Sequence, residues 1–349
     1  MPILWGQTYT RLDLLRHIGD MRQLAAVQPF ELSDGRERGV RCINVRNAAG
    51  LEFTVTTDRG MGLTDLRFHG VPLPFITAVD VAQPAYAEHT GLGWLRTWPA
   101  GFSTPCGLTQ VGGPGNDAGE ELGLHGRLSN LPASHVSCRE EWQADDYVLS
   151  VEGTVRQTAV FGENLVLSRR IWTKLDEPRF WIEDRIENQG FSPAPLMFLH
   201  HINLGFPLVD ASARLELPPR TTEARDDVAR PGLDHCCEFN EPIDGYEEQV
   251  FYHDLQADAA GQVEVRFVNP AFNANQGLGF ALRYSKSEFP VLVQWKMMRA
   301  GLYVAGIEPA NCHVQGRSAE RERGTLQMIE PQAVQTFKIE VAFFNHTAP

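Results

Sequence analysis

The sequence lacks the basic clusters that nucleic-acid binding requires. Its 349 residues include 31 Lys and Arg against 44 Asp and Glu, which gives a formal net charge of -13. Because proteins bind the phosphate backbone through a basic surface, this balance excludes DNA and RNA as expected partners. An acidic surface of this kind mainly keeps a protein in solution.

Long apolar runs are also missing. No stretch approaches the roughly 20 apolar residues of a membrane-spanning helix, so we expect no membrane contact. Residues 1–17 carry no basic start followed by an apolar run, which is the pattern of a signal peptide. These features together predict a cytoplasmic protein.

Cysteine is scarce and scattered. The six cysteines are Cys42, Cys106, Cys138, Cys236, Cys237 and Cys312. Their spacing is not that of a metal finger, and a disulfide between the adjacent Cys236 and Cys237 would be badly strained. We therefore expect free thiols in a reducing compartment and no metal site built on cysteine.

Helical signals are few as well. Thr10 and Asp13 form a capping-box pattern at the start of one short helix, with Gly19 as a plausible stop. Strands do not alternate with helices, which argues against a parallel doubly wound sheet, and no solenoid or propeller repeat is visible. The remaining sequence has to form its core from strands.

Most of the chain alternates between apolar and polar residues. This period of two runs through residues 147–156, 165–175 and 180–187, with turns between them, and returns at 335–343. The pattern predicts an all-β fold, a large antiparallel β-sandwich with a few short helices, forming a single domain over residues 1–349.

Two stretches interrupt the alternation. Residues 101–120 are rich in Gly and Pro and predict a long loop. Residues 218–248 are also irregular, and we expect them to cover one rim of a site. Long ordered loops over a sheet often carry function.

Two segments far apart in sequence carry the chemistry that stands out. In residues 199–207, His200 and His201 are adjacent, so on a strand they face opposite sides and only one can enter a given pocket. Asn203 and Gly205 follow on the side of His201, which favours it over His200. Glu308, in residues 303–311, stands in an apolar strand that could raise its pKa toward neutrality. The alternative is a carboxylate paired with an arginine.

Further candidates lie at glycine-rich corners. Asp58 and Arg59 precede Gly60, where either they form an exposed turn or Arg59 reaches inward and binds hydroxyl oxygens. His125 stands before Gly126, which allows close backbone approach around a pocket. The alternative for His125 is a histidine packed beneath the neighbouring loop.

One strand presents different residues on its two faces. Lys296 lies on one face with Gln294, where it neutralises an acidic substrate or forms a surface ion pair. Trp295 lies on the other face, where it stacks on a sugar or fills the core, and the core is the safer expectation. No third His or carboxylate at a recognisable spacing completes a metal site with His200 or His201.

These motifs, in this order, resemble the aldose 1-epimerase (galactose mutarotase-like) superfamily, in particular its uncharacterised bacterial branches. The segments that carry the resemblance are residues 58–70, 105–113, 124–130, 201–207 and 294–311. The resemblance implies a β-supersandwich whose site lies on an open concave sheet face. It also implies acid–base catalysis without metal or organic cofactor.

By the same resemblance, Glu308 is the base and His201 the acid in ring opening of a sugar. Arg59 and His125 would hold substrate hydroxyls. Independently of the resemblance, Asp58, Asn203 and Lys296 are further candidate substrate-binding residues. The family's His-X-aromatic-aromatic-Asn-Leu pattern is compressed here to residues 201–204, so His200 remains an alternative acid.

The expected function is interconversion of the anomers of a monosaccharide or sugar acid. A non-catalytic carbohydrate-binding protein that uses the same sheet face is the alternative. A third possibility is a metal-dependent sugar isomerase built on His125, His200 or His201. The expected partner is a small sugar, and the sequence does not indicate an oligomeric state.

Overall fold

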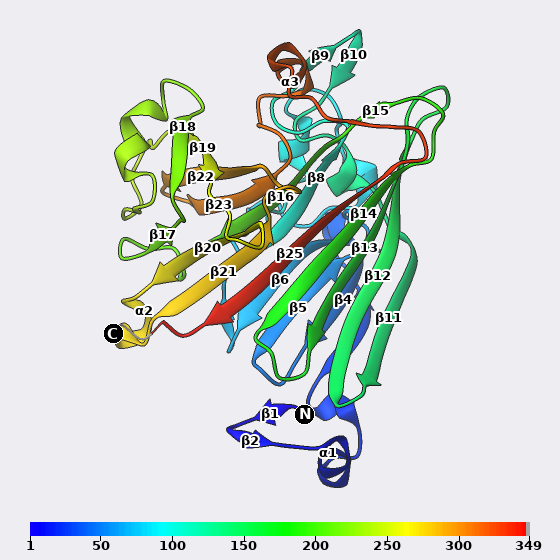
Figure 1. Ribbon diagram of the computed structural model, residues 1–349, viewed down its shortest axis with the longest axis vertical. Coiled ribbons are helices and arrows are strands. Elements are labelled where there is room, and N and C mark those ends of the chain that lie inside the picture. The colour runs from blue at the N-terminus through cyan, green and yellow to red at the C-terminus, as the bar shows by residue number, and fades with distance from the viewer. Residues whose placement is uncertain (347–349) are drawn as a thin grey trace.

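Two antiparallel sheets stacked face to face form most of the molecule. The structure, a computed structural model, describes residues 1–346 (Figure 1). In the strand Asp146–Thr158 the predicted inward side chains of Tyr147, Leu149, Val151 and Val155 are buried, but burial alternates only from Val151 onward, because Val148 and Ser150 on the other face are buried too. The all-β prediction is therefore correct.

The first sheet has eight strands. In hydrogen-bonding order they are β11 (Ser134–Gln143), β12 (Asp146–Thr158), β13 (Asn164–Lys174), β14 (Arg179–Asn188), β25 (Val334–Phe344), β21 (Leu278–Ser285), β20 (Gln262–Asn269) and β17 (Arg214–Glu216). The strands predicted from residues 147–187 are neighbours in the sheet, so they form the expected meander.

The second sheet has eleven strands and holds both segments of the candidate site. In hydrogen-bonding order they are β18 (Arg220–Ala224), β19 (Gln249–Leu255), β22 (Val291–Arg299), β23 (Leu302–Ala310), β16 (Met197–Leu204), β8 (Ser103–Leu108), β6 (Gly62–Phe68), β5 (Leu51–Thr56), β4 (Arg41–Arg46) and β3 (Ala26–Glu31), with β7 (Val71–Pro72) added beside β6.

Short helices and strands lie at the ends of the two large sheets (Figure 1). The helices are α1 (Arg11–His17), α2 (Phe272–Asn275) and α3 (Arg317–Arg323), and the 3-10 turns are η1 (Met21–Gln23), η2 (Gly35–Glu37), η3 (Pro84–Tyr86), η4 (Gly93–Arg96), η5 (Leu128–Asn130) and η6 (Arg230–His235). The small strands are β1 (Ile3–Leu4), β2 (Gln7–Thr8), β9 (Gly115–Asp117), β10 (Glu120–Leu122), β15 (Ala194–Pro195) and β24 (Met328–Ile329). The capping box predicted at Thr10 and Asp13 is present. No helix within residues 1–346 is long and apolar enough to cross a membrane.

Aromatic side chains fill the space between the two sheets. Phe53 of the eleven-stranded sheet contacts Phe180 of the eight-stranded sheet, with ring centroids 5.1 Å apart. Phe102 meets Phe280 and Phe343 edge to face. All five rings are buried, so the core lies between the sheets and leaves the outer face of each sheet for other uses.

The predicted loop over residues 101–120 is wrong in its first part. Residues 103–108 form β8, an interior strand whose residues pair with β16. Its Pro105 and Gly107 gave the segment the composition of a loop. Pro105 is tolerated because β6 pairs with β8 only at Ser103, so the missing N–H interrupts no ladder on that side.

Candidate active site

Strand β16 sends its two histidines to opposite faces of the eleven-stranded sheet. His200 points into the space between the sheets, where its Nε2 lies 3.2 Å from Asp184 Oδ2. His201 points outward into a cavity. Alternation along the strand thus separates the two residues, and His201 is the one that a ligand can reach.

A fully buried ion pair lies behind the strand. Arg169 of β13 makes two hydrogen bonds to Asp184 of β14, at 2.7 and 2.8 Å, and both side chains have no solvent exposure. Burial would raise the pKa of Asp184, but the charge of Arg169 and hydrogen bonds from His200 and Arg169 hold it below its usual value. His200 therefore belongs to a structural network.

His201 and Glu308 face each other across neighbouring strands. The register that pairs Leu199 with Ala310 and Ile202 with Ile307 sets His201 opposite Glu308. His201 Nδ1 lies 3.3 Å from Glu308 Oε1, and within residues 1–346 both are buried atoms without a hydrogen-bond partner. The two segments singled out in the sequence therefore meet at their titratable residues.

Glycine makes room for the carboxyl group. Gly306 lies two residues before Glu308 on the same face of β23, and a Cβ there would stand 2.4 Å from Glu308 Oε1. Glu308 is 2% exposed, and burial raises its pKa well above the usual carboxyl range. The ion pair with arginine that was the alternative for Glu308 is not formed.

The pKa of the neighbouring imidazole, His201, is shifted in the opposite direction. Burial lowers the pKa of His201 to about 4, although the nearby side chain of Asn203 acts to raise it. Both shifts favour the uncharged forms of the two groups, a neutral imidazole beside a protonated carboxyl group. Because the two groups are in contact, a proton can pass between them.

The pair forms part of the wall of a cavity of about 410 Å³ on the outer face of the eleven-stranded sheet. This volume falls within the range of roughly 300–1,000 Å³ that is typical of small-molecule sites. The side chains around it are mostly apolar. They belong to Leu92, Trp94, Leu95, Trp98, Pro114, Leu124, His125, His201, Arg225, Glu248, Val250, Val293, Trp295, Glu308 and Val314.

His125 is a second histidine of this cavity, as the sequence predicted. Its ring centroid lies 5.4 Å from that of His201, and its backbone adopts a positive φ of 55°. A Cβ on the following Gly126 would stand 2.4 Å from the backbone oxygen of Gln110, so close backbone approach does explain that glycine. Burial and the nearby His201 lower the pKa of His125 well below its usual value.

Three tryptophans surround His201. The ring centroids of Trp98, Trp295 and Trp94 lie 5.2, 5.6 and 6.4 Å from that of His201. Trp295 lines the cavity and does not fill the core, which corrects the safer expectation from the sequence. Trp94 and Trp98 were not predicted, although two tryptophans in an irregular segment are a usable signal for a ligand wall.

Arg225 and Glu248 line the cavity from the irregular segment 218–248. Arg225 Nη2 donates to Glu248 Oε1 at 3.0 Å, and its Nε donates to Asp226 at 2.7 Å. Glu248 Oε2 accepts a hydrogen bond from the indole of Trp295 at 2.9 Å. The prediction that this segment covers one rim of the site is confirmed, but its two charged residues were missed.

The structure does not bring Asp58 and Arg59 into the cavity. Asp58 accepts hydrogen bonds from the backbone and side chain of Arg41 on the neighbouring β4. Arg59 is buried, and its guanidinium donates to the backbone oxygens of Ala82 and Thr97 at 2.9 and 2.6 Å. Both side chains hold loops against the sheet, so their predicted contact with substrate is not supported.

Lys296 and Asn203 are also placed away from the cavity lining. Lys296 points to the face opposite Trp295, is 3% exposed, and donates to the backbone oxygen of His235 at 3.1 Å. It does not line the cavity, and within residues 1–346 it forms no ion pair. Asn203 is fully buried and donates to the backbone oxygens of Gly101 and His201. Its position beside His201 makes it a neighbour of the pair, not a ligand group.

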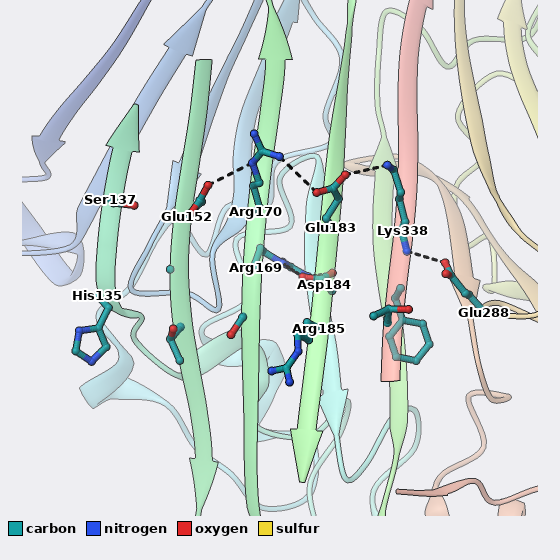
Figure 2. A pocket seen from close by; sticks show the side chains of 15 residues that line it. His135, Ser137, Glu152, Arg169, Arg170, Glu183, Asp184, Arg185, Glu288 and Lys338 are labelled. Carbon is teal, nitrogen blue, oxygen red and sulfur yellow. Dashed lines mark hydrogen bonds and ion pairs between the residues drawn. The ribbon is translucent and has the colours of Figure 1, made fainter. Parts of the chain in front are cut away.

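A wider hollow of about 610 Å³ lies on the outer face of the eight-stranded sheet (Figure 2). Its charged side chains pair with one another across the strands. Arg170 contacts Glu152 and Glu183, and Lys338 contacts Glu183 at 2.8 Å. These charges compensate one another across the strands, whereas the His201–Glu308 pair beside the three tryptophans is buried and has no counter-charge bound to it among the described residues.

Comparisons with known proteins agree with the resemblance inferred from the sequence. A family model described as "Domain of unknown function (DUF4432)" matches residues 37–343. No curated protein matches the chain. Within the described residues 1–346, no group of three or more His, Cys, Asp or Glu side chains could hold a metal ion.

Solved structures share the fold. A candidate aldose 1-epimerase from Klebsiella pneumoniae is similar with a TM-score of 0.87 and 24% identity, over 92% of this chain and 84% of the other. A galactose mutarotase-like protein from Clostridium acetobutylicum gives a TM-score of 0.62 and 14% identity, over 93% and 100%. A galactose 1-epimerase from Lactobacillus acidophilus gives 0.53 and 13%, over 92% and 99%. The galactose mutarotase-like fold is thereby confirmed.

Proposed function

We propose that this chain, which belongs to the DUF4432 family, interconverts the anomers of a neutral monosaccharide by proton transfer at His201 and Glu308. The observation that carries the proposal is the 3.3 Å contact between His201 Nδ1 and Glu308 Oε1 in a cavity sized for a small molecule. A carboxyl group with a raised pKa and an imidazole with a lowered one are suited to exchange protons near neutral pH.

The reaction needs one proton to leave the anomeric hydroxyl and one to reach the ring oxygen. Both oxygens are bonded to the same carbon, so the acid and the base have to be neighbours. With the shared proton on His201, Glu308 takes the hydroxyl proton while His201 protonates the ring oxygen. The bond between the anomeric carbon and the ring oxygen then breaks, and the hydroxyl-bearing carbon becomes an aldehyde.

Rotation about the bond between C1 and C2 followed by ring closure gives the other anomer. Closure runs the same proton transfers in reverse, so the pair returns to its starting state. The neutral resting pair and the reactive pair differ only in the position of one proton across the contact. His125 stands beside His201, where it can hold a substrate hydroxyl.

A neutral sugar is favoured over a sugar acid by the charges around the cavity. Among the described residues that line it, Arg225 is the one basic side chain other than histidine, and Asp226 and Glu248 already bind its guanidinium. A substrate carboxylate would have to compete with those two carboxylates. Lys296 and Arg59 point elsewhere.

The proposal is tested by saturation-transfer NMR on the wild-type protein with a panel of neutral aldoses and uronates. We expect exchange between anomers faster than the spontaneous rate for at least one neutral sugar, and the same rate after exhaustive chelation. Binding without exchange for every sugar would favour the carbohydrate-binding alternative. Activity lost on chelation would favour a metal-dependent isomerase.

The pH dependence of activity follows from the paired titration. The pair is active while it holds one proton. Burial lowers the pKa of His201 to about 4, so a second proton binds, and removes the acceptor, only below about pH 4. We expect kcat/KM, corrected for the spontaneous reaction, to fall on the acid side only below about pH 4. An acid limb near the ordinary histidine value, about 6.5, would contradict this assignment.

A further inference from the structure

Trp94, Trp98 and Trp295 form what we call the tryptophan wall of the cavity, and the N–H group of each indole already donates to a protein side chain. Trp94 Nε1 donates to Ser129 Oγ at 2.8 Å, Trp98 Nε1 donates to Thr104 Oγ1 at 3.0 Å, and Trp295 Nε1 donates to Glu248 Oε2 at 2.9 Å. Each indole therefore offers a ligand only its carbon face. A hydroxyl group placed against this wall finds no indole donor.

The backbone near His125 is committed in the same way. The N–H of Gly112 reaches His125 Nδ1, and its oxygen accepts from the N–H of His125 at 2.9 Å. Gly113 donates to the oxygen of Val314, and its own oxygen accepts from Gln110 Nε2 at 2.7 Å. The following Pro114 has no N–H. This side of the cavity also offers few partners to a sugar hydroxyl.

The position of the reacting atoms fixes which part of a sugar meets the tryptophans. In a pyranose the ring oxygen is bonded to C5, so the substituent on C5 lies next to the group that protonates the ring oxygen. That group is His201 in the proposed function, on which this step rests. The nearest rings to His201 are Trp98, His125, Trp295 and Trp94.

We propose that the substrate is a 6-deoxy sugar, an aldose that carries a methyl group on C5 in place of hydroxymethyl. A methyl group packs against the indole carbon faces and needs no hydrogen bond. A hydroxymethyl group at the same place gives up water for a wall without an uncommitted donor. Of the other polar side chains that line the cavity, Glu308 and His201 lie where the ring and anomeric oxygens react, with His125 beside them, and Arg225 and Glu248 are bonded to each other.

Matched pairs of sugars test the proposal on the wild-type protein. The pairs are D-fucose with D-galactose, L-fucose with L-galactose, L-rhamnose with L-mannose, and D-quinovose with D-glucose, which differ within each pair only at C6. We expect kcat/KM for anomer exchange to favour the deoxy member of the best pair by about 10- to 100-fold. The pentose that lacks C6 should also be a poorer substrate, because it leaves the wall uncovered.

The possible outcomes distinguish the 6-deoxy assignment from the proposed function, anomer exchange, on which it rests. Equal rates, or a preference for hydroxymethyl sugars, would overturn the 6-deoxy assignment while leaving anomer exchange intact. No exchange with any sugar would defeat the proposed function itself.

A pair of variants at Trp98 adds a second test. Trp98→Phe keeps a carbon face and should keep the deoxy preference, whereas Trp98→His supplies an uncommitted ring nitrogen and should narrow it. The same preference for 6-deoxy sugars in both variants would mean that Trp98 does not determine specificity at C6. If either variant fails to fold, the sugar pairs on the wild-type protein still decide the question.

Discussion

The Glu308→Gln variant is expected to lose anomer exchange by at least about 10²- to 10⁴-fold, the usual contribution of a positioned acid or base. Glutamine keeps the size of the side chain but can neither accept nor deliver the proton that His201 exchanges across the 3.3 Å contact. Because the buried site loses no volume, sugar affinity should change by much less than the rate. Exchange rate and dissociation constant, measured on the same sample, separate the two effects.

Glu152→Gln is the matched control. Glu152 lies in the charged hollow on the opposite sheet, where it contacts Arg170 at the surface (Figure 2). The same chemical change there should leave the exchange rate unaltered. If Glu308→Gln retained wild-type exchange, the carboxyl group would not be the proton carrier and the proposed mechanism would be wrong.

Replacing Asp184 with Asn is expected to destabilise the fold by about 3–5 kcal/mol, the usual cost of breaking a buried ion pair from one side. The substitution leaves the guanidinium of Arg169 without its counter-charge in a space where neither side chain is exposed. It also removes the negative partner of His200 on the strand that carries His201. The free energy of unfolding from urea titration measures this cost.

An exposed pair provides the comparison. Asp65 contacts Arg67 at 3.4 Å with both side chains well exposed, so Asp65→Asn should change the free energy of unfolding by no more than about 1 kcal/mol. A loss below about 1 kcal/mol for Asp184→Asn as well would mean that water reaches the Arg169 pair, and that it does not anchor the strand.

Local pattern sufficed for much of the fold. The period of two in residues 147–156 predicts β12 because strand alternation depends only on which side chains meet the core. The same rule separated His200 from His201. Which of the two enters the cavity depends on Asp184, a partner on another sheet, and adjacency in sequence carries no information about it.

The wrong predictions for site residues also arose from contacts between segments distant in sequence. Alternation correctly placed Trp295 and Lys296 on opposite faces of β22, but it did not say which face lines the cavity. The sequence therefore assigned Lys296 to the substrate and Trp295 to the core, whereas Trp295 lines the cavity and Lys296 is buried on the other face. Arg59 has the charge of a ligand-binding residue, yet its partners are backbone oxygens supplied by loops remote in sequence. Long-range contacts decided each of these positions.

The most direct test of the account is a crystal structure of the Glu308→Gln variant with a bound sugar that the wild-type protein exchanges. We expect the ring oxygen within hydrogen-bonding distance of His201 and the anomeric oxygen within the same distance of the residue 308 amide, roughly 2.6–3.2 Å in each case. The C5 substituent should lie against the tryptophans. A sugar bound with its anomeric carbon turned away from both residues would contradict the assignment of His201 and Glu308 as the proton-transfer pair.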